Sequence, residues 1–93
     1  MIKSFKCKET ERVFNRQFSR QLPQNIQRLV WRKLAQLHAA SVLDTLRIPP
    51  GNRLEALSGA RAGQHSIRVN DQRRICFVWR DGHAFEVEVT DYH

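Results

Sequence analysis

Apolar residues recur at every second position in three successive segments of this chain. The segments are residues 65–69, 74–79 and 85–89, and their alternating apolar members are Ile67, Val69, Ile75, Phe77, Trp79, Phe85, Val87 and Val89. This period is typical of strands with one buried face. Turn-forming residues separate the segments, at 70–72 and 81–83. The pattern therefore predicts three strands joined by two hairpins.

The same pattern predicts the register between the last two strands. A two-residue loop at Asp81-Gly82 would place Phe77 on the same face as Glu86 and mix apolar with charged residues. A three-residue loop over residues 81–83 instead gives apolar pairs on one face: Trp79 with Phe85, Phe77 with Val87, and Ile75 with Val89. The other face then holds Glu86, Glu88 and Thr90 opposite Val78, Cys76 and Arg74. Because a one-residue slip turns every side chain over, the three-residue loop is favoured.

A three-residue loop at residues 70–72 predicts two further cross-strand pairs, Ile67 with Ile75 and Arg68 with Arg74. Like charges placed directly opposite are unfavourable by roughly 0.2–1 kcal/mol. Two interpretations of the arginine pair remain open. Either Glu86 or Glu88 neutralises it on a solvated face, or the two guanidinium groups clamp phosphate oxygens.

The first half of the chain predicts a strand at residues 2–7 and helices at 10–18 and 24–40. The second helix has the clearest apolar stripe, formed by Ile26, Leu29, Val30, Leu34 and Leu37, and Pro23 suits its first position. Ser41 with Asp44 resembles a capping box for a short turn at 42–46, and residues 52–63 read as a loop. This order predicts an α+β domain with helices on one face of a small, mostly antiparallel sheet.

Composition says more about the binding partners of the chain than about its fold. Ninety-three residues fit a single domain over 1–93, and the formal charge of +7 favours a polyanionic partner. A soluble basic protein without such a partner is the alternative. Cys7 and Cys76 fit reduced thiols, and no apolar run reaches membrane-spanning length. We therefore expect a cytoplasmic protein without a membrane partner.

Metal and nucleotide chemistry are not indicated by any motif. The four histidines, His38, His65, His83 and His93, lack metal-ligand spacing, and no P-loop or dinucleotide fingerprint occurs. RNA cleavage needs no cofactor, because the ribose 2′-OH can attack the adjacent phosphate. The protein must then stabilise the phosphorane charge and protonate the leaving 5′-oxygen. Arginines on the open sheet face and a terminal histidine would supply these two functions.

Four stretches together resemble one known family. They are MIKSF (1–5), PPGNRLEALSG (49–59), RAGQHSIRVNDQRRICF (61–77) and DYH (91–93). In these the chain is similar to the HigB-type toxins (HigB/GraT group) of the RelE superfamily. The resemblance implies a RelE-like fold and a ribosome-dependent endoribonuclease that cuts mRNA in the A site. It also implies a helix-turn-helix, HigA-like antitoxin encoded beside the toxin, with operator DNA bound only through that antitoxin.

The resemblance places the family's active region on Asp91, Tyr92 and His93, with Arg74 at a basic position of the sheet. Asp91 would orient His93 or hold it protonated. Tyr92 would stack on a base or hydrogen-bond the scissile phosphate. His93 would be the general acid, since its ordinary pKa of roughly 6.5 permits proton exchange near neutrality.

Two positions of the loop depart from the family. Glu55 stands where HigB-type toxins can carry a histidine, and Ser58 stands where they can carry a lysine. We expect the absence of this histidine and this lysine, two potentially cationic groups, to weaken phosphate stabilisation. Either nearby arginines compensate or the enzyme is slow. The candidate compensating residues are Arg53, Arg61 and Arg68.

Arginines in and beside the two predicted helices form a weaker candidate surface, for docking on ribosomal RNA: Arg12, Arg16, Arg20, Arg28 and Arg32. The alternative is that they form only a solvated helix face.

For the whole chain, two other functions remain. One is a non-catalytic basic module that binds the ribosome or nucleic acid, with DYH structural. The other is a subunit that only represses transcription within a complex.

Overall fold

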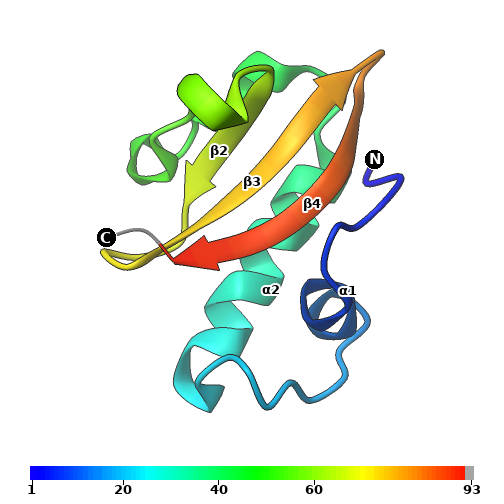
Figure 1. Cartoon of the computed structure of the whole chain (residues 1–93), viewed down its shortest axis with the longest axis vertical. Coiled ribbons are helices and arrows are strands. Elements are labelled where there is room, and N and C mark those ends of the chain that lie inside the picture. Colours follow the sequence, from blue (N-terminus) through cyan, green and yellow to red (C-terminus); the bar gives the residue numbers. More distant parts are fainter. Residues whose placement is uncertain (92–93) are drawn as a thin grey trace.

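Two helices cover one face of a four-stranded antiparallel sheet in the computed structural model, which describes residues 1–91 (Figure 1). The helices are α1 (Lys8–Phe14) and α2 (Gln24–Ala39). The strands, in spatial order, are β1 (Glu55–Ala56), β2 (Gln64–Arg68), β3 (Arg73–Arg80) and β4 (His83–Asp91). Short 3₁₀ helices lie at Leu43–Arg47, Pro50–Asn52 and Gly59–Arg61. The predicted α+β architecture is confirmed.

The core lies between α2 and the sheet, and α2 crosses behind the strands in Figure 1. Val30, Leu34 and Leu37 are fully buried on the stripe that the sequence predicted. They pack with the sheet's core residues, which include Ile67, Ile75, Phe77 and Val87. Each such side chain contributes roughly 1.5–3 kcal/mol on burial. Trp31 packs at the margin of this core.

The N-terminal segment differs from the predicted strand. Ile2 and Phe5 form isolated parallel bridges to Ala84 and Val87 of β4, and no continuous strand is formed. The segment therefore covers the outer edge of β4. A further strand, β1, lies in the stretch 52–63 that the sequence had indicated as loop.

Helix α1 begins two residues earlier than predicted and ends four residues earlier, at Phe14. Its end is a Schellman motif: the Arg16 N–H donates to the Val13 carbonyl (3.0 Å) and the Gln17 N–H to the Arg12 carbonyl (2.7 Å). Arg16 takes the left-handed position, with φ 60°. Because that conformation cannot continue a helix, Phe18 falls in the following loop.

Two smaller expectations about helix starts are wrong. The capping box at Ser41 does not form, because Val42 is the N-cap residue of the 3₁₀ helix and makes no side-chain capping bond. Asp44 pairs instead with Arg47 at 2.5 Å. Pro23 is the N-cap residue of α2, one position before the predicted one.

The hairpin between β2 and β3 has the predicted register. Ile67 pairs with Ile75 and Arg68 with Arg74. The Asn70 side chain closes the loop by accepting from the N–H groups of Gln72 (2.9 Å) and Arg73 (2.8 Å). The two arginines therefore lie opposite one another on the face that the helices leave uncovered.

The hairpin between β3 and β4 follows the prediction only beyond Phe77. Near the turn Arg80 pairs with His83, so the loop has two residues, Asp81 and Gly82, both with positive φ. This is the geometry that an Asp-Gly pair favours in a tight hairpin. The register then shifts by one residue, so that farther along the strands Ile75 pairs with Val89 as predicted.

A β-bulge on β4 produces this shift. Phe77 faces two residues, Glu86 and Val87, and Glu86 adopts φ 54°. Both bulge N–H groups bind Ser4: Glu86 donates to its Oγ (2.9 Å) and Val87 to its carbonyl (3.1 Å). The N-terminal segment thus satisfies the backbone groups that the bulge releases from the ladder.

Because of the bulge, Phe85 does not lie where the sequence predicted. Phe85 lies opposite Val78, where Glu86 had been expected, and the Arg80 guanidinium lies 4.4 Å from its ring. Ala84 fills the core position opposite Trp79 instead. Val87 and Val89 remain on the core side as predicted. The bulge therefore keeps Phe77 and Val87 buried together despite the two-residue turn.

Phe77→Ala should lower the free energy of unfolding by about 3–5 kcal/mol, because it removes a fully buried ring from the core. Phe18→Ala is the matched control: the same atoms leave a side chain that is 62% exposed, and the expected change is below about 0.5 kcal/mol. Urea unfolding followed by circular dichroism measures both. Equal losses would contradict this assignment of the core.

Candidate functional site

Arg74 is fixed on the open face of the sheet by contacts with Ser66, Arg53 and Glu55, which lie in different segments. Its Nε donates to Ser66 Oγ at 2.7 Å, and Nη2 donates to the Arg53 carbonyl at 2.9 Å. Nη1 lies 3.5 Å from Glu55 Oε1. Only 13% of the Arg74 side chain is exposed. Two of the three contacts are to neutral oxygens, so they orient the guanidinium without cancelling its charge.

Strand pairing explains why these groups meet. Arg74 and Ser66 are diagonal neighbours on the same face of β2 and β3, and β1 places Glu55 directly opposite Ser66. Ser66 is fully buried, so its hydroxyl is confined to this contact. The carboxylate of Glu55 is more than half exposed, at 55%. The site therefore combines a buried anchor with an accessible acid–base group.

Arg68 lies beside Arg74 but has its own carboxylate partner, Asp71. The expectation that Glu86 or Glu88 neutralises the arginine pair is therefore wrong. The neutralising residues are Asp71 for Arg68 and Glu55 for Arg74. The two guanidinium groups are adjacent in register, but Arg68 pairs within its own hairpin, whereas Arg74 pairs with Glu55 of β1.

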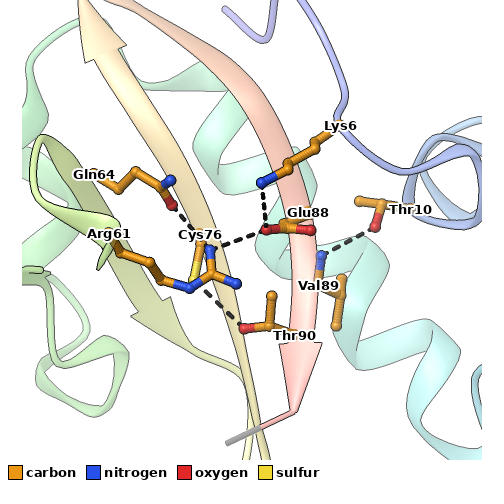
Figure 2. A network of polar contacts seen from close by, with 8 residues as sticks. All are labelled: Lys6, Thr10, Arg61, Gln64, Cys76, Glu88, Val89 and Thr90. Atoms are coloured by element: carbon orange, nitrogen blue, oxygen red, sulfur yellow. Dashed lines mark hydrogen bonds and ion pairs between the residues drawn. The ribbon is translucent and has the colours of Figure 1, made fainter. Parts of the chain in front are cut away.

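Glu88 is used elsewhere on this face, as Figure 2 shows. Arg61 reaches across the strands and donates from Nη1 to Glu88 Oε1 at 3.0 Å and to Gln64 Oε1 at 3.1 Å. Lys6 approaches the same carboxylate at 3.8 Å. The hydrogen bond to Glu88 raises the pKa of Arg61, so its charge is permanent. This network holds the 59–61 turn against the open face.

Below the network, Cys76 Sγ lies 3.5 Å from Thr90 Oγ1 (Figure 2). Cys76 is almost fully buried, and both cysteines are free thiols. The Val89 N–H on the other side of β4 donates to Thr10 Oγ1 at 3.0 Å. β4 is thereby tied to the loop network on one face and to α1 on the other.

Asn52 anchors the start of the site loop to α2. Its buried Nδ2 donates to the Leu46 carbonyl (3.1 Å) and Gln36 Oε1 (3.2 Å), and its Oδ1 accepts from Lys33 Nζ (2.5 Å). Desolvation lowers the pKa of Lys33. Because Arg53 follows directly, α2 fixes the carbonyl that holds Arg74.

Asp91 does not lie beside Arg74. It pairs with Arg73, whose Nε is 2.9 Å from Asp91 Oδ1, and both line a cavity of about 260 Å³ with Thr10 of α1. This is the helix-covered side of the sheet, whereas Thr90 pairs with Arg74 on the open side. Asp91 and Arg74 therefore lie on opposite sides of the sheet. Tyr92 and His93 lie outside the described residues.

The remaining predicted residues divide between two places. Arg53, Glu55 and Arg61 gather around the open face, while Ser58 is exposed just before the 59–61 turn. The helical arginines lie away from this site: Arg12 pairs with Glu9 at 3.2 Å, and the Arg16 guanidinium lies 4.0 Å from the Trp31 ring. Arg28 and Arg32 line a groove beside Trp31, together with Arg16.

Sequence reasoning missed Ser66, Gln64, Asn52 and Arg73. The predicted β2–β3 register already placed Ser66 near Arg74, so a polar residue inside a strand was the available signal. Asn52 gives no local signal, because its role depends on contacts with Lys33 and Gln36 of a distant helix.

Neither a metal-binding group nor a membrane-spanning helix is found in residues 1–91. No group of three or more histidine, cysteine, aspartate or glutamate side chains in this range could hold a metal ion. Within the same range, no helix is both long and apolar enough to cross a membrane.

The fold is shared with a toxin of known structure. The chain matches the YoeB–YefM complex from Staphylococcus aureus with a TM-score of 0.57 and 18% identity, over 100% of this chain and 98% of that one. A second structure, a heterotetrameric YoeB–YefM toxin–antitoxin complex from the same organism, gives a TM-score of 0.56 at 18% identity and the same coverage. These two likenesses show a shared fold.

Sequence relatives define the family. A model described as HigB-like toxin, "RelE-like toxin of type II toxin-antitoxin system HigB", matches residues 3–93. Toxin HigB-1 of Vibrio cholerae serotype O1 is 51% identical over 65 residues, 70% of this chain and 68% of that protein. An uncharacterized Haemophilus influenzae protein is 35% identical over 60 residues, 64% of this chain and 59% of its own length. The chain belongs to the HigB-like family of type II toxin–antitoxin toxins.

A double-mutant cycle should show that Arg61 and Glu88 are coupled. Arg61→Gln and Glu88→Gln should each lower the free energy of unfolding. In the double variant this free energy should fall by about 1 kcal/mol less than the sum of the two single losses, because Glu88 is largely shielded while Arg61 is partly solvated. The control is the exposed Arg47–Asp44 pair, where coupling should stay below about 0.5 kcal/mol. Additive losses at Arg61 and Glu88 would mean that the network does not hold the turn.

Proposed function

We propose that this toxin is a ribosome-dependent mRNA endoribonuclease that needs no metal ion and cuts mRNA in the ribosomal A site. The observation that carries the proposal is the fixed Arg74 guanidinium beside the accessible Glu55 carboxylate. Transfer of a phosphoryl group from the 5′-oxygen to the neighbouring 2′-oxygen needs a fixed positive charge and a base in reach of one phosphate. Membership of the HigB-like family supports the same activity.

In the proposed reaction, Glu55 accepts the proton of the 2′-OH as its oxygen attacks the scissile phosphorus. Arg74 stabilises the negative charge that builds on the phosphorane oxygens. The bond to the 5′-oxygen then breaks, and His93 protonates that oxygen as it leaves. The products are a 2′,3′-cyclic phosphate and a 5′-hydroxyl end. Glu55 thus replaces a cationic group of the family by a proton acceptor.

Other residues of the site would bind and orient the RNA. Tyr92 stacks on a base, and Arg53, Arg68 and Ser58 contact the flanking phosphates. Arg61 contributes positive charge from a fixed position, because Glu88 and Gln64 hold its guanidinium. Asp91 acts through Arg73: their ion pair fixes the end of β4 just before the residues that carry the proton-transfer step.

The helical arginines would serve a different purpose, docking on ribosomal RNA. Arg12, Arg20, Arg28 and Arg32 add positive charge on a surface away from Arg74, and contacts to many phosphates weaken steeply as salt is raised. The proposed partners are therefore the ribosome with its mRNA, in the cytoplasm, and a helix-turn-helix antitoxin of the HigA type. Operator DNA would be bound only through the antitoxin.

A second candidate function is a non-catalytic module that binds the ribosome. One observation favours it: both arginines of the expected clamp already have carboxylate partners, Asp71 and Glu55. A phosphate must then displace Glu55 from Arg74 or share it. The two functions differ in whether bound mRNA is cut.

Single-turnover cleavage on saturating, programmed ribosomes separates the two. Arg74→Ala should slow cleavage by roughly 10²–10³ through loss of charge stabilisation, and His93→Ala by roughly 10²–10⁴ through loss of the proton donor. Arg80→Ala is the matched control, since Arg80 lies at the opposite end of β3 against Phe85. Thermal melts of each variant check folding.

Four results would count against the proposal. Parent-like cleavage by both Arg74→Ala and His93→Ala would show that the cleavage reaction does not depend on this site. Intact mRNA on ribosomes saturated with the parent protein would favour the non-catalytic module. Equal rates on naked and ribosome-bound mRNA would exclude ribosome dependence. Full activity is expected when the toxin is dialysed against a chelator before it is added to the ribosomes, and loss of activity after this treatment would contradict metal independence.

A further inference from the structure

A groove of about 600 Å³ runs between the end of α1 and the first half of α2, on a part of the molecule that the cleavage site does not use. Its lining combines apolar and cationic side chains, chiefly Val13, Phe18, Trp31, Arg16, Arg28 and Arg32. No acidic residue of the described chain lines it. The groove therefore has an apolar floor and a positively charged rim.

The shape of the groove is fixed before any partner binds. Arg16 holds the left-handed position that ends α1, and its guanidinium covers the Trp31 ring at 4.0 Å. A non-glycine residue rarely takes this conformation, because its Cβ lies too close to the following carbonyl oxygen. The backbone here thus keeps a strained arginine in the position that lets it pack on Trp31.

Phe18 is held at the rim with 62% of its surface exposed. Its neighbours fix the backbone on both sides: the Gln17 N–H donates to the Arg12 carbonyl at 2.7 Å. Ser19 donates its N–H to Gln27 Oε1 (3.3 Å) and accepts from Gln27 Nε2 at its carbonyl (2.8 Å). An exposed aromatic ring on an immobilised backbone loses little entropy when it binds a partner.

We propose that this groove docks an acidic amphipathic helix of the antitoxin. Phe18 would pack on an apolar residue of that helix, while Arg28 and Arg32 bind carboxylates on either side of it. Arg28 and Arg32 lie one helical turn apart on α2, so they match acidic residues spaced three or four positions apart on a facing helix. Apolar anchors between charged contacts are the usual arrangement for a helix bound in a groove.

Protein fits the groove better than RNA does. The Trp31 ring already carries the Arg16 guanidinium on one face, so it is a poor platform for stacking a base. A concave floor around Val13, which is buried, suits a protruding aliphatic side chain. The proposal rests on the proposed function, because it assumes an antitoxin. It adds that the bound antitoxin helix covers arginines proposed to dock on ribosomal RNA and leaves Arg74 uncovered.

The test is the affinity of the full-length toxin for the purified antitoxin encoded beside it, measured by calorimetry. Phe18→Ser and the pair Arg28→Glu with Arg32→Glu should each weaken binding by roughly tenfold or more, as expected for interface anchors. Phe18→Leu keeps an apolar anchor and should retain affinity. Lys3→Glu is the charge-reversal control, because exposed Lys3 lies on the N-terminal segment and does not line the groove.

Parent-like affinity in both groove variants would overturn the proposal, and so would a parent toxin that binds no antitoxin. Groove variants that bind antitoxin normally but lose ribosome binding would assign the groove to RNA and also overturn it. Because the assay involves no RNA, a toxin that fails to cut mRNA but shows the expected affinities would refute only the endoribonuclease function. Circular dichroism melts establish that each variant is folded.

Discussion

The register between β3 and β4 changes by one residue at Phe77, and both faces of the sheet depend on that change. The Asp81-Gly82 turn requires a two-residue loop, whereas burial of Phe77 with Val87 requires the other register. The bulge at Glu86 satisfies both, and Ser4 binds the N–H groups that it displaces. Without the shift, Val89 and Thr90 would exchange faces, and β4 would present an apolar residue to the site.

The open face is organised by contacts that reach back to α2. Lys33 and Gln36 hold Asn52, the next residue gives its carbonyl to Arg74, and Ser66 fixes the other edge of the guanidinium. Each step is a hydrogen bond between groups with few alternative partners, so the position of Arg74 is coupled to the packing of α2. This coupling lets a protein of 93 residues hold a charged side chain at 13% exposure on its surface.

Much of the fold was predictable from local patterns. The alternation of Ile67, Ile75 and Phe77 and the stripe on α2 gave the architecture, and the β2–β3 register followed from the three-residue loop. The first error lay at Asp81-Gly82, where turn chemistry and apolar alternation conflict. A bulge resolves such a conflict, and its position depends on contacts with Ser4, eighty-two positions away.

The site was predictable in its residue types but not in its pairings. Arg74, Arg61 and Glu55 were expected near the open face. Their partners were not, because a side chain that reaches from the 59–61 turn to β4, as Arg61 does to contact Glu88, leaves no periodic signal. Asp91 was grouped with Arg74 through the family motif, although strand alternation places it with Arg73 on the helix side.

The central claim is that the Arg74–Glu55 face cuts mRNA on the ribosome. The most direct measurement is mapping of mRNA 5′ ends in cells that express the parent toxin or Arg74→Ala at matched protein levels, each with and without the neighbouring antitoxin gene. The parent should generate new 5′-hydroxyl ends with three-nucleotide periodicity within reading frames. Those ends should disappear with Arg74→Ala or with the antitoxin. Growth arrest by the parent without new ends, or ends unrelated to the reading frame, would contradict the account.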